Sequence, residues 1–419
     1  MRGVRGTSAL GVAVLFLTAC STPSVAGQDD GGTEGATDLV TDLGVTDDAI
    51  NLGILADLTG PFSARSVGIL QGNQLVYDAI NSNGGICGRQ IELDIQNHGY
   101  DVAQAVRFYD EMEPNVLGMT QLSGSPMIAA LLDQITSDNL VTASASEAST
   151  LLESPYILVG GATHDIEMIN GIQWMVDQGK IAEGDTVGHI YSADEYGANG
   201  LLGARYAAAE HGLSLVEVQS SESALSDAIS SLMDQDVSAI LLTTTPDQTV
   251  SAVSAAASMG FDVPFLANNP AFAPALLDSP ATPALEASLF VEASTAPYAS
   301  DTPEAQELRD RLKEKFPDAS PNGGQFYGYG VATIYASVIE RACENGDLTR
   351  AGLQTALTET TDGDTGGIIA LLDYSQPGAS PSREIYIAQP SADAEGGLVL
   401  VEELFTTDLA QGYVGPFEG

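Results

Sequence analysis

The segment 123–126 (SGSP) carries the clearest chemical signal in this sequence. It follows a short apolar run and precedes a helical pattern, which places it where a strand gives way to a helix. Ser125 suits the helix cap and Pro126 the first turn, and free N–H groups there favour an anion such as a carboxylate. The segment predicts an anion-binding loop, although it would equally suit a helix cap without a ligand. The candidate binding residues are Ser123, Gly124, Ser125 and, on the same wall, Gln121.

A second polar segment, 144–147 (SASE), follows the next apolar run. Parallel sheets bind ligands in the loops at the carboxyl ends of their strands, so we expect both segments at one site. Glu147 is a carboxylate that can hold a cation but would repel a ligand carboxylate. Alternatively, it turns into solvent or caps the next turn. The candidate binding residues here are Ser144, Ala145, Ser146 and Glu147.

The sequence offers little for catalysis. Its four histidines lie far apart, and none has the spacing of a metal site with cysteine or another histidine. A Gly-x-Ser-x-Gly elbow and a Walker A loop are both absent from the sequence. We therefore predict a protein that binds its ligand without enzymatic activity, and without a cofactor or a metal.

Alternating strand and helix patterns must position these segments. The first expected strands are 49–55, 91–96, 116–119 and 139–143, with helical patterns between them. This βα rhythm predicts parallel strands with right-handed crossovers. Because the strands are too many for one small sheet, we expect an α/β fold with two doubly wound, Rossmann-like lobes.

The N-terminus has the pattern of an export signal. Arg2 and Arg5 precede the apolar stretch 10–17, which is shorter than the roughly 20 residues of a membrane-spanning helix. The segment that follows, LTAC, resembles a bacterial lipobox in which Cys20 would be lipidated. The alternative is an ordinary signal peptide with an incidental cysteine. We expect a lipoprotein signal peptide at 1–19, a flexible linker at 20–48, and anchoring outside the cytoplasm at the bacterial cell membrane.

Charge and cysteine content narrow the function further. The chain has 14 basic and 57 acidic residues, a formal net charge of −43, which argues against nucleic acid as a partner. Besides Cys20, the sequence contains only Cys87 and Cys343. An even pair in an exported protein indicates a disulfide, but two separately buried thiols would also fit.

Four segments together resemble a known family. They are NLGILADLTGPF at 51–62, DAINSNGGICGR at 78–89, IYSADEYG at 190–197 and GYGVA at 328–332. In this order they are similar to the type I periplasmic binding proteins, specifically the Leu/Ile/Val-binding branch that serves ABC importers. The resemblance runs from about residue 49 to the C-terminus.

The resemblance implies two lobes joined by a three-crossover hinge, which close over a ligand in the cleft. Lobe one would hold 49–161 and 293–364, and lobe two 162–292 and 365–419. Cys87 and Cys343 would both fall in lobe one, which favours the disulfide.

The resemblance also implies roles for the candidate residues. The loop 123–125 would bind an α-carboxylate, and the loop 144–146 would bind the carboxylate and ammonium ends of the ligand. Tyr196 would cover the ligand from lobe two, and Phe62 would add an apolar wall.

The sequence departs from the family pattern at three of these positions. Glu147 stands where serine or threonine is expected, and Thr245 follows a strand where an aromatic residue is common. Asn269 lies where an acid would receive the ligand ammonium. Either Glu147 has taken over that role, or the ligand is not a simple amino acid.

These observations predict a lipid-anchored solute-binding protein. It would act as a monomer, capture a small polar or zwitterionic molecule, and deliver it to ABC permease subunits. Amino acids are the first expected ligands, followed by amides and related compounds. The alternative is a ligand-sensing receptor on the same scaffold that signals to a membrane partner.

Overall fold

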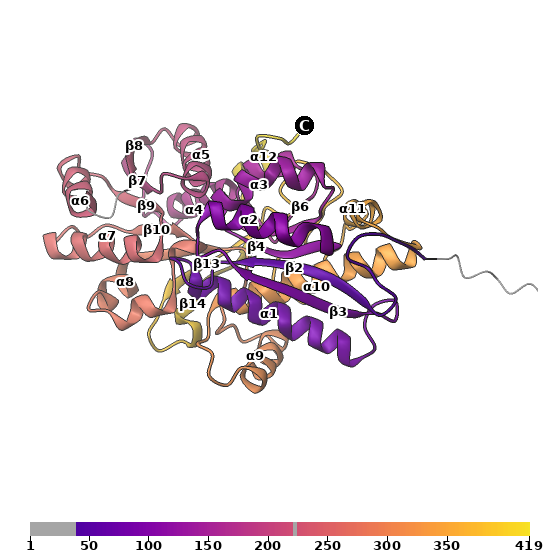
Figure 1. Ribbon diagram of the computed structural model, residues 1–419. Coiled ribbons are helices and arrows are strands. Elements are labelled where there is room, and N and C mark those ends of the chain that lie inside the picture. The colour runs from indigo at the N-terminus through magenta and orange to yellow at the C-terminus, as the bar shows by residue number, and fades with distance from the viewer. Residues whose placement is uncertain (1–38, 221–223) are drawn as a thin grey trace, which may run out of the picture. The chain divides into compact units, whose positions relative to one another are not determined.

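Two β-sheets with mostly parallel strands organise the chain (Figure 1). The computed structural model describes residues 39–220 and 224–419. The predicted signal peptide 1–19, Cys20 and the linker as far as residue 38 lie outside the described residues. No helix in the described part of the chain is long and apolar enough to cross a membrane.

The first sheet has the strand order β3-β2-β4-β5-β6 and is parallel throughout. Its interior strand β2 is buried along nearly its whole length, as expected of an apolar strand covered on both faces. In this doubly wound order the loops after β2 and β4 diverge, which creates a crevice for a ligand. The strands are β2 (Ala49–Ala56), β3 (Gln90–Asn97), β4 (Gly118–Ser123), β5 (Thr142–Ala145) and β6 (Ile157–Val159).

Helices cover both faces of the first sheet (Figure 1). α2 and α3 pack on one face, and α1 packs with α10 on the other. α1 and α10 approach so closely at Gly72 that a Cβ there would lie 2.3 Å from the backbone nitrogen of Tyr329. The helices are α1 (Ser63–Ser82), α2 (Val102–Met112), α3 (Ser125–Ser137), α9 (Pro303–Lys315), α10 (Gly323–Glu344) and α11 (Arg350–Thr358).

The second sheet has the order β14-β13-β11-β10-β9-β7-β8. Strands β13 and β14 join antiparallel, and the other pairs are parallel. Its parallel part repeats the order of the first sheet, so its switch point lies between β7 and β9. The strands are β7 (Thr186–Tyr191), β8 (Ser214–Gln219), β9 (Ala239–Thr243), β10 (Phe265–Asn268), β11 (Leu289–Ala293), β13 (Ile385–Pro390) and β14 (Leu398–Phe405).

Two apolar cores cover the second sheet. One contains side chains of α4, α5 and α12, and the other contains side chains of α6, α7 and α8. The chain passes between the two sheets after β6, after β11 and before β13. The helices are α4 (His164–Asp177), α5 (Glu195–Glu210), α6 (Leu225–Asp234), α7 (Pro246–Met259), α8 (Thr282–Ser288) and α12 (Asp408–Gly412).

The predicted α/β fold with two doubly wound sheets is confirmed, but two predicted boundaries differ. Within the predicted linker, β1 (Val40–Thr41) pairs in parallel with β12 (Asp347–Leu348). Ile368 and Leu372, predicted in lobe two, pack in the core of the first sheet. Both segments are held by packing against residues distant in the sequence. The remaining division into lobes stays a prediction.

The structure forms the predicted disulfide between Cys87 and Cys343. It joins the turn before β3 to the last turn of α10, and both cysteines pack against the core of the first sheet. A bridge that closes so long a loop typically contributes about 2–4 kcal/mol of stability.

Candidate functional site

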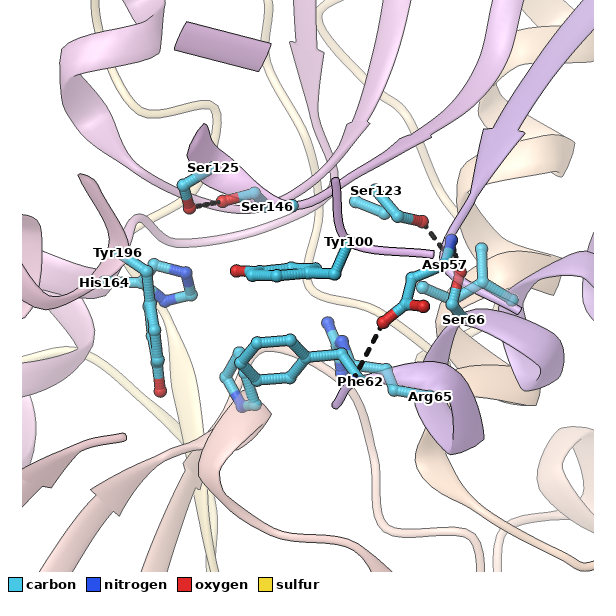
Figure 2. Close-up of a pocket in the computed structure, with 14 residues that line it drawn as sticks. Asp57, Phe62, Arg65, Ser66, Tyr100, Ser123, Ser125, Ser146, His164 and Tyr196 are labelled. Carbon is cyan, nitrogen blue, oxygen red and sulfur yellow. Dashed lines mark hydrogen bonds between the residues drawn. The ribbon is translucent and has the colours of Figure 1, made fainter. Parts of the chain in front are cut away.

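A cavity lies at the switch point of the first sheet, where the loops after β2, β4 and β5 meet the starts of α4 and α5 (Figure 2). It encloses about 410 Å³ of space free of atoms, including its open mouth. Its wall combines serine hydroxyls, aromatic rings and two basic side chains. The lining residues are Asp57, Phe62, Arg65, Ser66, Ile69, Tyr100, Ser123, Gly124, Ser125, Ala145, Ser146, His164, Tyr196 and Pro270.

Paired serine hydroxyls form the polar part of the wall. The hydroxyls of Ser125 and Ser146 contact each other. Those of Ser66 and Ser123 are 2.9 Å apart, and the Gln121 amide donates to both. Two paired hydroxyls hold two protons and use one between them, so each pair keeps a proton for another acceptor. The predicted loops 123–125 and 144–146 therefore do meet at one site.

The structure corrects the predicted cap of α3. The N-cap is Gly124, with φ 96° and ψ 123°, and no side chain caps the helix. Ser125 is the first helical residue, so its hydroxyl is available to Ser146 and the cavity. Glycine is required at 124 because φ is positive and a Cβ would lie 2.8 Å from a ring carbon of Tyr100. Ser144 stays within β5, and its hydroxyl bonds the backbone of Ser146.

Aromatic rings form the apolar part of the wall. The Phe62 ring lies 4.9 Å from that of Tyr100 and 6.2 Å from that of Tyr196, centroid to centroid. Tyr196 also packs edge-on against His164 at 4.9 Å. It belongs to the first turn of α5, and its buried hydroxyl has no hydrogen-bond partner among the described residues. Burial, followed by the charges of Glu167 and Asp194, raises the pKa of Tyr196.

Asp57 lines the cavity, but its carboxylate is already occupied. It accepts the backbone N–H groups of Thr59, Gly60 and Phe62, the last at 3.0 Å. The backbone N–H of Asp57 itself donates to Ser66 at 3.1 Å. Asp57 therefore shapes the β2–α1 loop that presents Phe62.

Glu147 lies behind the cavity wall and is 2% exposed. Its carboxylate lies 3.1 Å from Nη2 of Arg65 and 3.6 Å from Nε2 of His164. Nδ1 of His164 lies 2.9 Å from Oε2 of Glu167. Burial lowers the pKa of His164, but the hydrogen bond and charge of Glu167, with the charge of Glu147, outweigh burial and raise it. Two carboxylates thus balance two basic side chains at the wall.

A buried polar chain continues from Glu167 into the second sheet. The Asn268 amide donates to Glu167 and Glu292, both at 3.0 Å, and its oxygen accepts from Thr243 at 2.9 Å. Burial, with the charge of Glu167, raises the pKa of Glu292 well above its usual range. Nε2 of His189 lies 3.0 Å from the Thr243 hydroxyl, and burial lowers the pKa of His189 to about 3. These groups bond to one another and do not line the cavity.

Thr245 and Asn269, both predicted to bind the ligand, do not line the cavity. Thr245 caps α7 and forms a capping box with Gln248. Asn269 begins the short 3-10 helix Asn269–Ala271 and lines an adjacent hollow with Arg65. A ligand role for either residue stays a prediction.

Arg65, Tyr100 and His164 line the cavity but were not predicted from the sequence. Arg65 carried a usable signal, because it is one of 14 basic residues and follows the Phe62 loop directly. The cavity wall carries spare hydroxyl protons, and the carboxylate of Asp57 on that wall is bonded to its own loop. Among the described residues, no group of three or more His, Cys, Asp or Glu is placed to hold a metal ion.

Comparison with solved structures finds a close likeness. The fatty acid ABC transporter substrate-binding protein from Thermomonospora curvata is 38% identical over 90% of this chain and 97% of its own, with a TM-score of 0.87.

Two more distant structures share the fold. A branched chain amino acid ABC transporter protein from Thermus thermophilus, solved with bound valine, is 18% identical, with a TM-score of 0.76 over 88% of this chain and 99% of its own. A leucine binding protein from Thermotoga maritima is also 18% identical, with a TM-score of 0.73 over 86% of this chain and 99% of its own. No curated protein sequence matches significantly.

The family described as "Periplasmic binding protein" matches residues 49–396, most of the chain. The match includes both sheets up to the start of β14 and every cavity residue. The resemblance to type I periplasmic binding proteins inferred from the ordered motifs is therefore confirmed, and this chain belongs to the periplasmic binding protein family.

Proposed function

We propose that this protein is a lipid-anchored, extracytoplasmic solute-binding protein that delivers a small molecule to an ABC importer. Family membership supports the location and the binding role. The name of the T. curvata relative supports the importer as partner. The LTAC segment that ends at Cys20 supports the anchor.

The ligand that we propose is a small carboxylate with an apolar body and no cationic group. The single observation that carries this proposal is that the carboxylates beside the cavity already have partners within the protein. Asp57 is bonded to its own loop, and Glu147 is paired with Arg65 and His164. Among the described acids, an ammonium on the cavity wall would meet only Asp57, whose two oxygens already accept backbone N–H groups, and burying it unpaired is costly. The proposal thus differs from the amino acid predicted from the sequence, and it agrees with the name of the T. curvata relative.

The donors in the cavity suit a carboxylate. Ser125 and Ser146 keep a hydroxyl proton, and the backbone N–H of Ser125 at the start of α3 adds a donor. Pro126 has no N–H, and that of Met127 donates to the carbonyl of Gly124. Hydrogen bonds to a charged acceptor are stronger than those between neutral groups. The rings of Phe62, Tyr100 and Tyr196 would surround the apolar body of the ligand.

Ligand capture is proposed to draw the two sheets together. The serines follow strands of the first sheet, whereas His164 and Tyr196 belong to helices packed on the second. A ligand that contacts both sets binds the closed form better than the open form, which is the condition for closure to follow binding.

Hexanoate and norleucine form the pair of probes that tests the ligand class, because they share a carbon skeleton and differ by one ammonium. We expect hexanoate to raise the melting temperature of the lipid-free protein, and to do so more than norleucine. Stabilisation should grow as RT ln(1 + [L]/Kd), reaching about 2.7 kcal/mol at a hundredfold excess over Kd. Hexan-1-ol controls for the apolar body alone. Stronger stabilisation by norleucine would restore the amino-acid prediction.

The anchor has a separate test. We expect the full-length protein to partition with bacterial membranes and Cys20→Ser to abolish this partitioning, because the thiol that carries the lipid is gone. Equal partitioning of both proteins would rule out lipidation at this position.

A further inference from the structure

Tyr100 reaches the middle of the cavity from the loop between β3 and α2. Its ring packs on that of Phe62 and lies against Gly124, where a Cβ would approach a ring carbon to 2.8 Å. In Figure 2 the ring lies between the Ser125–Ser146 pair and Phe62, and its hydroxyl points toward the side where Tyr196 and His164 lie. The ring therefore occupies space between the walls of the cavity.

The backbone holds Tyr100 in an unusual conformation. Its φ is 62°, in the left-handed region that few residues other than glycine adopt, and Gly99 before it has φ 58°. The N–H of Tyr100 donates to Nδ1 of His98 at 3.0 Å, and Asp101 caps α2 by accepting from Gln104. Tyr100 itself and Asp101 after it are thus anchored. Strained residues of this kind concentrate at ligand clamps and active sites, where the surrounding structure maintains them.

The ring lies in the path of the proposed ligand body. A carboxylate at Ser125 and Ser146 would direct its body between Phe62 and Tyr196, toward the space that Tyr100 fills. Gly124 lies beside the ring, and a Cβ at that position would come within 2.8 Å of a ring carbon. The first methylenes of the body would gain apolar contacts, and further ones would meet the ring.

We propose that Tyr100 is the specificity-determining residue that limits the length of the ligand's apolar body. The inference rests on the proposed carboxylate ligand, and it deepens that proposal by assigning the size limit to one side chain. Each methylene buried beside the aromatic wall should tighten binding about fourfold. Once the body reaches the ring, overpacking should reverse the trend.

The test is a calorimetric series of linear monocarboxylates, from acetate to decanoate, on the whole protein. We expect the affinity of the wild type to rise to a short optimum and then fall. Tyr100→Ala should move the optimum to longer chains by removing the ring. Tyr100→Phe is the matched control, because it keeps the ring and should keep the wild-type optimum.

A second variant guards against loss of folding. Tyr100→Gly also removes the ring, and glycine adopts a φ of 62° without strain. It should therefore bind like Tyr100→Ala and have a melting temperature equal to or higher than that of Tyr100→Ala. An unchanged optimum in both ring-deleted variants, with binding retained, would overturn the role of Tyr100 and leave the proposed ligand class intact. Failure of every carboxylate to bind the wild type would instead overturn the ligand class, and this inference with it.

Discussion

The two sheets share one strand order but use their switch points differently. At the switch point of the first sheet, serine hydroxyls and the Phe62 loop face a cavity. At that of the second sheet, Thr245 caps α7, and Tyr196 reaches the cavity. The polar residues of the second sheet, such as Asn268 and Glu292, bond to one another in its interior. The same topology therefore yields a cavity with polar walls in one place and a buried hydrogen-bond network in the other.

The largest effect is expected where the two regions meet, at Glu147. Glu147→Gln removes the charge that balances Arg65 and His164, so it should lower the free energy of unfolding by about 3–5 kcal/mol. Chemical denaturation measures this change. Glu217→Gln is the matched control, because the Arg205–Glu217 pair is exposed and should contribute no more than about 1 kcal/mol. Equal losses in both variants would contradict the structural role of Glu147.

The second prediction contrasts Ser125 with Thr245. Ser125→Ala should weaken carboxylate binding by about 1.5–3 kcal/mol, because a hydroxyl donor to the anion is lost. Thr245→Ala should leave Kd unchanged and cost about 1 kcal/mol of stability through the lost cap of α7. Calorimetry measures Kd for both variants, and chemical denaturation measures the free energy of unfolding of each. A larger effect of Thr245→Ala on Kd would move recognition to the second sheet.

Two buried histidines should give the protein opposite responses to pH. The raised pKa of His164 means that its contribution to stability is present below the ordinary value of 6.5 and is lost as pH rises through the folded pKa. The pKa of His189 is lowered to about 3, so its effect is reversed and stability falls as pH drops below 6.5.

Substitution separates the two histidine effects. His164→Gln should flatten the loss of stability above pH 6.5, and His189→Gln should flatten the loss below it, each by at most about 1.4 kcal/mol per pH unit. Denaturation curves across the pH range provide the measurement. Identical pH profiles for the wild type and His164→Gln would show that His164 is not linked to folding.

The smallest effect is expected for the hydroxyl of Tyr196. It is buried without a partner in the described part of the chain, so Tyr196→Phe should change stability by less than about 1 kcal/mol and leave ligand affinity unchanged. Thermal unfolding and calorimetry check both values. A tenfold loss of affinity would instead show that this hydroxyl binds the ligand.

Much of the site could be predicted from the sequence because it follows local rules. Ser123–Ser125 and Ser144–Ser146 lie at strand ends, and strand ends of a parallel sheet converge. The pairing of Arg65 with Glu147 could not be predicted, because 82 residues separate them and only the folded chain brings them together.

Two other features could not be predicted from the sequence, each for a different physical reason. Asn268, not Asn269, carries the buried amide, because β10 ends at Asn268 and Asn269 begins the 3-10 helix that follows. Tyr100 reaches the cavity through a positive φ, a conformation that its residue type does not favour.

The central claim is that the first sheet recognises a carboxylate. A crystal structure of the protein with bound hexanoate tests it most directly. We expect carboxylate oxygens at roughly 2.5–3.2 Å from the hydroxyls or N–H groups of Ser125 and Ser146, with the carbon chain between Phe62 and Tyr196. A carboxylate bound instead at Thr245 or Asn269 would contradict it.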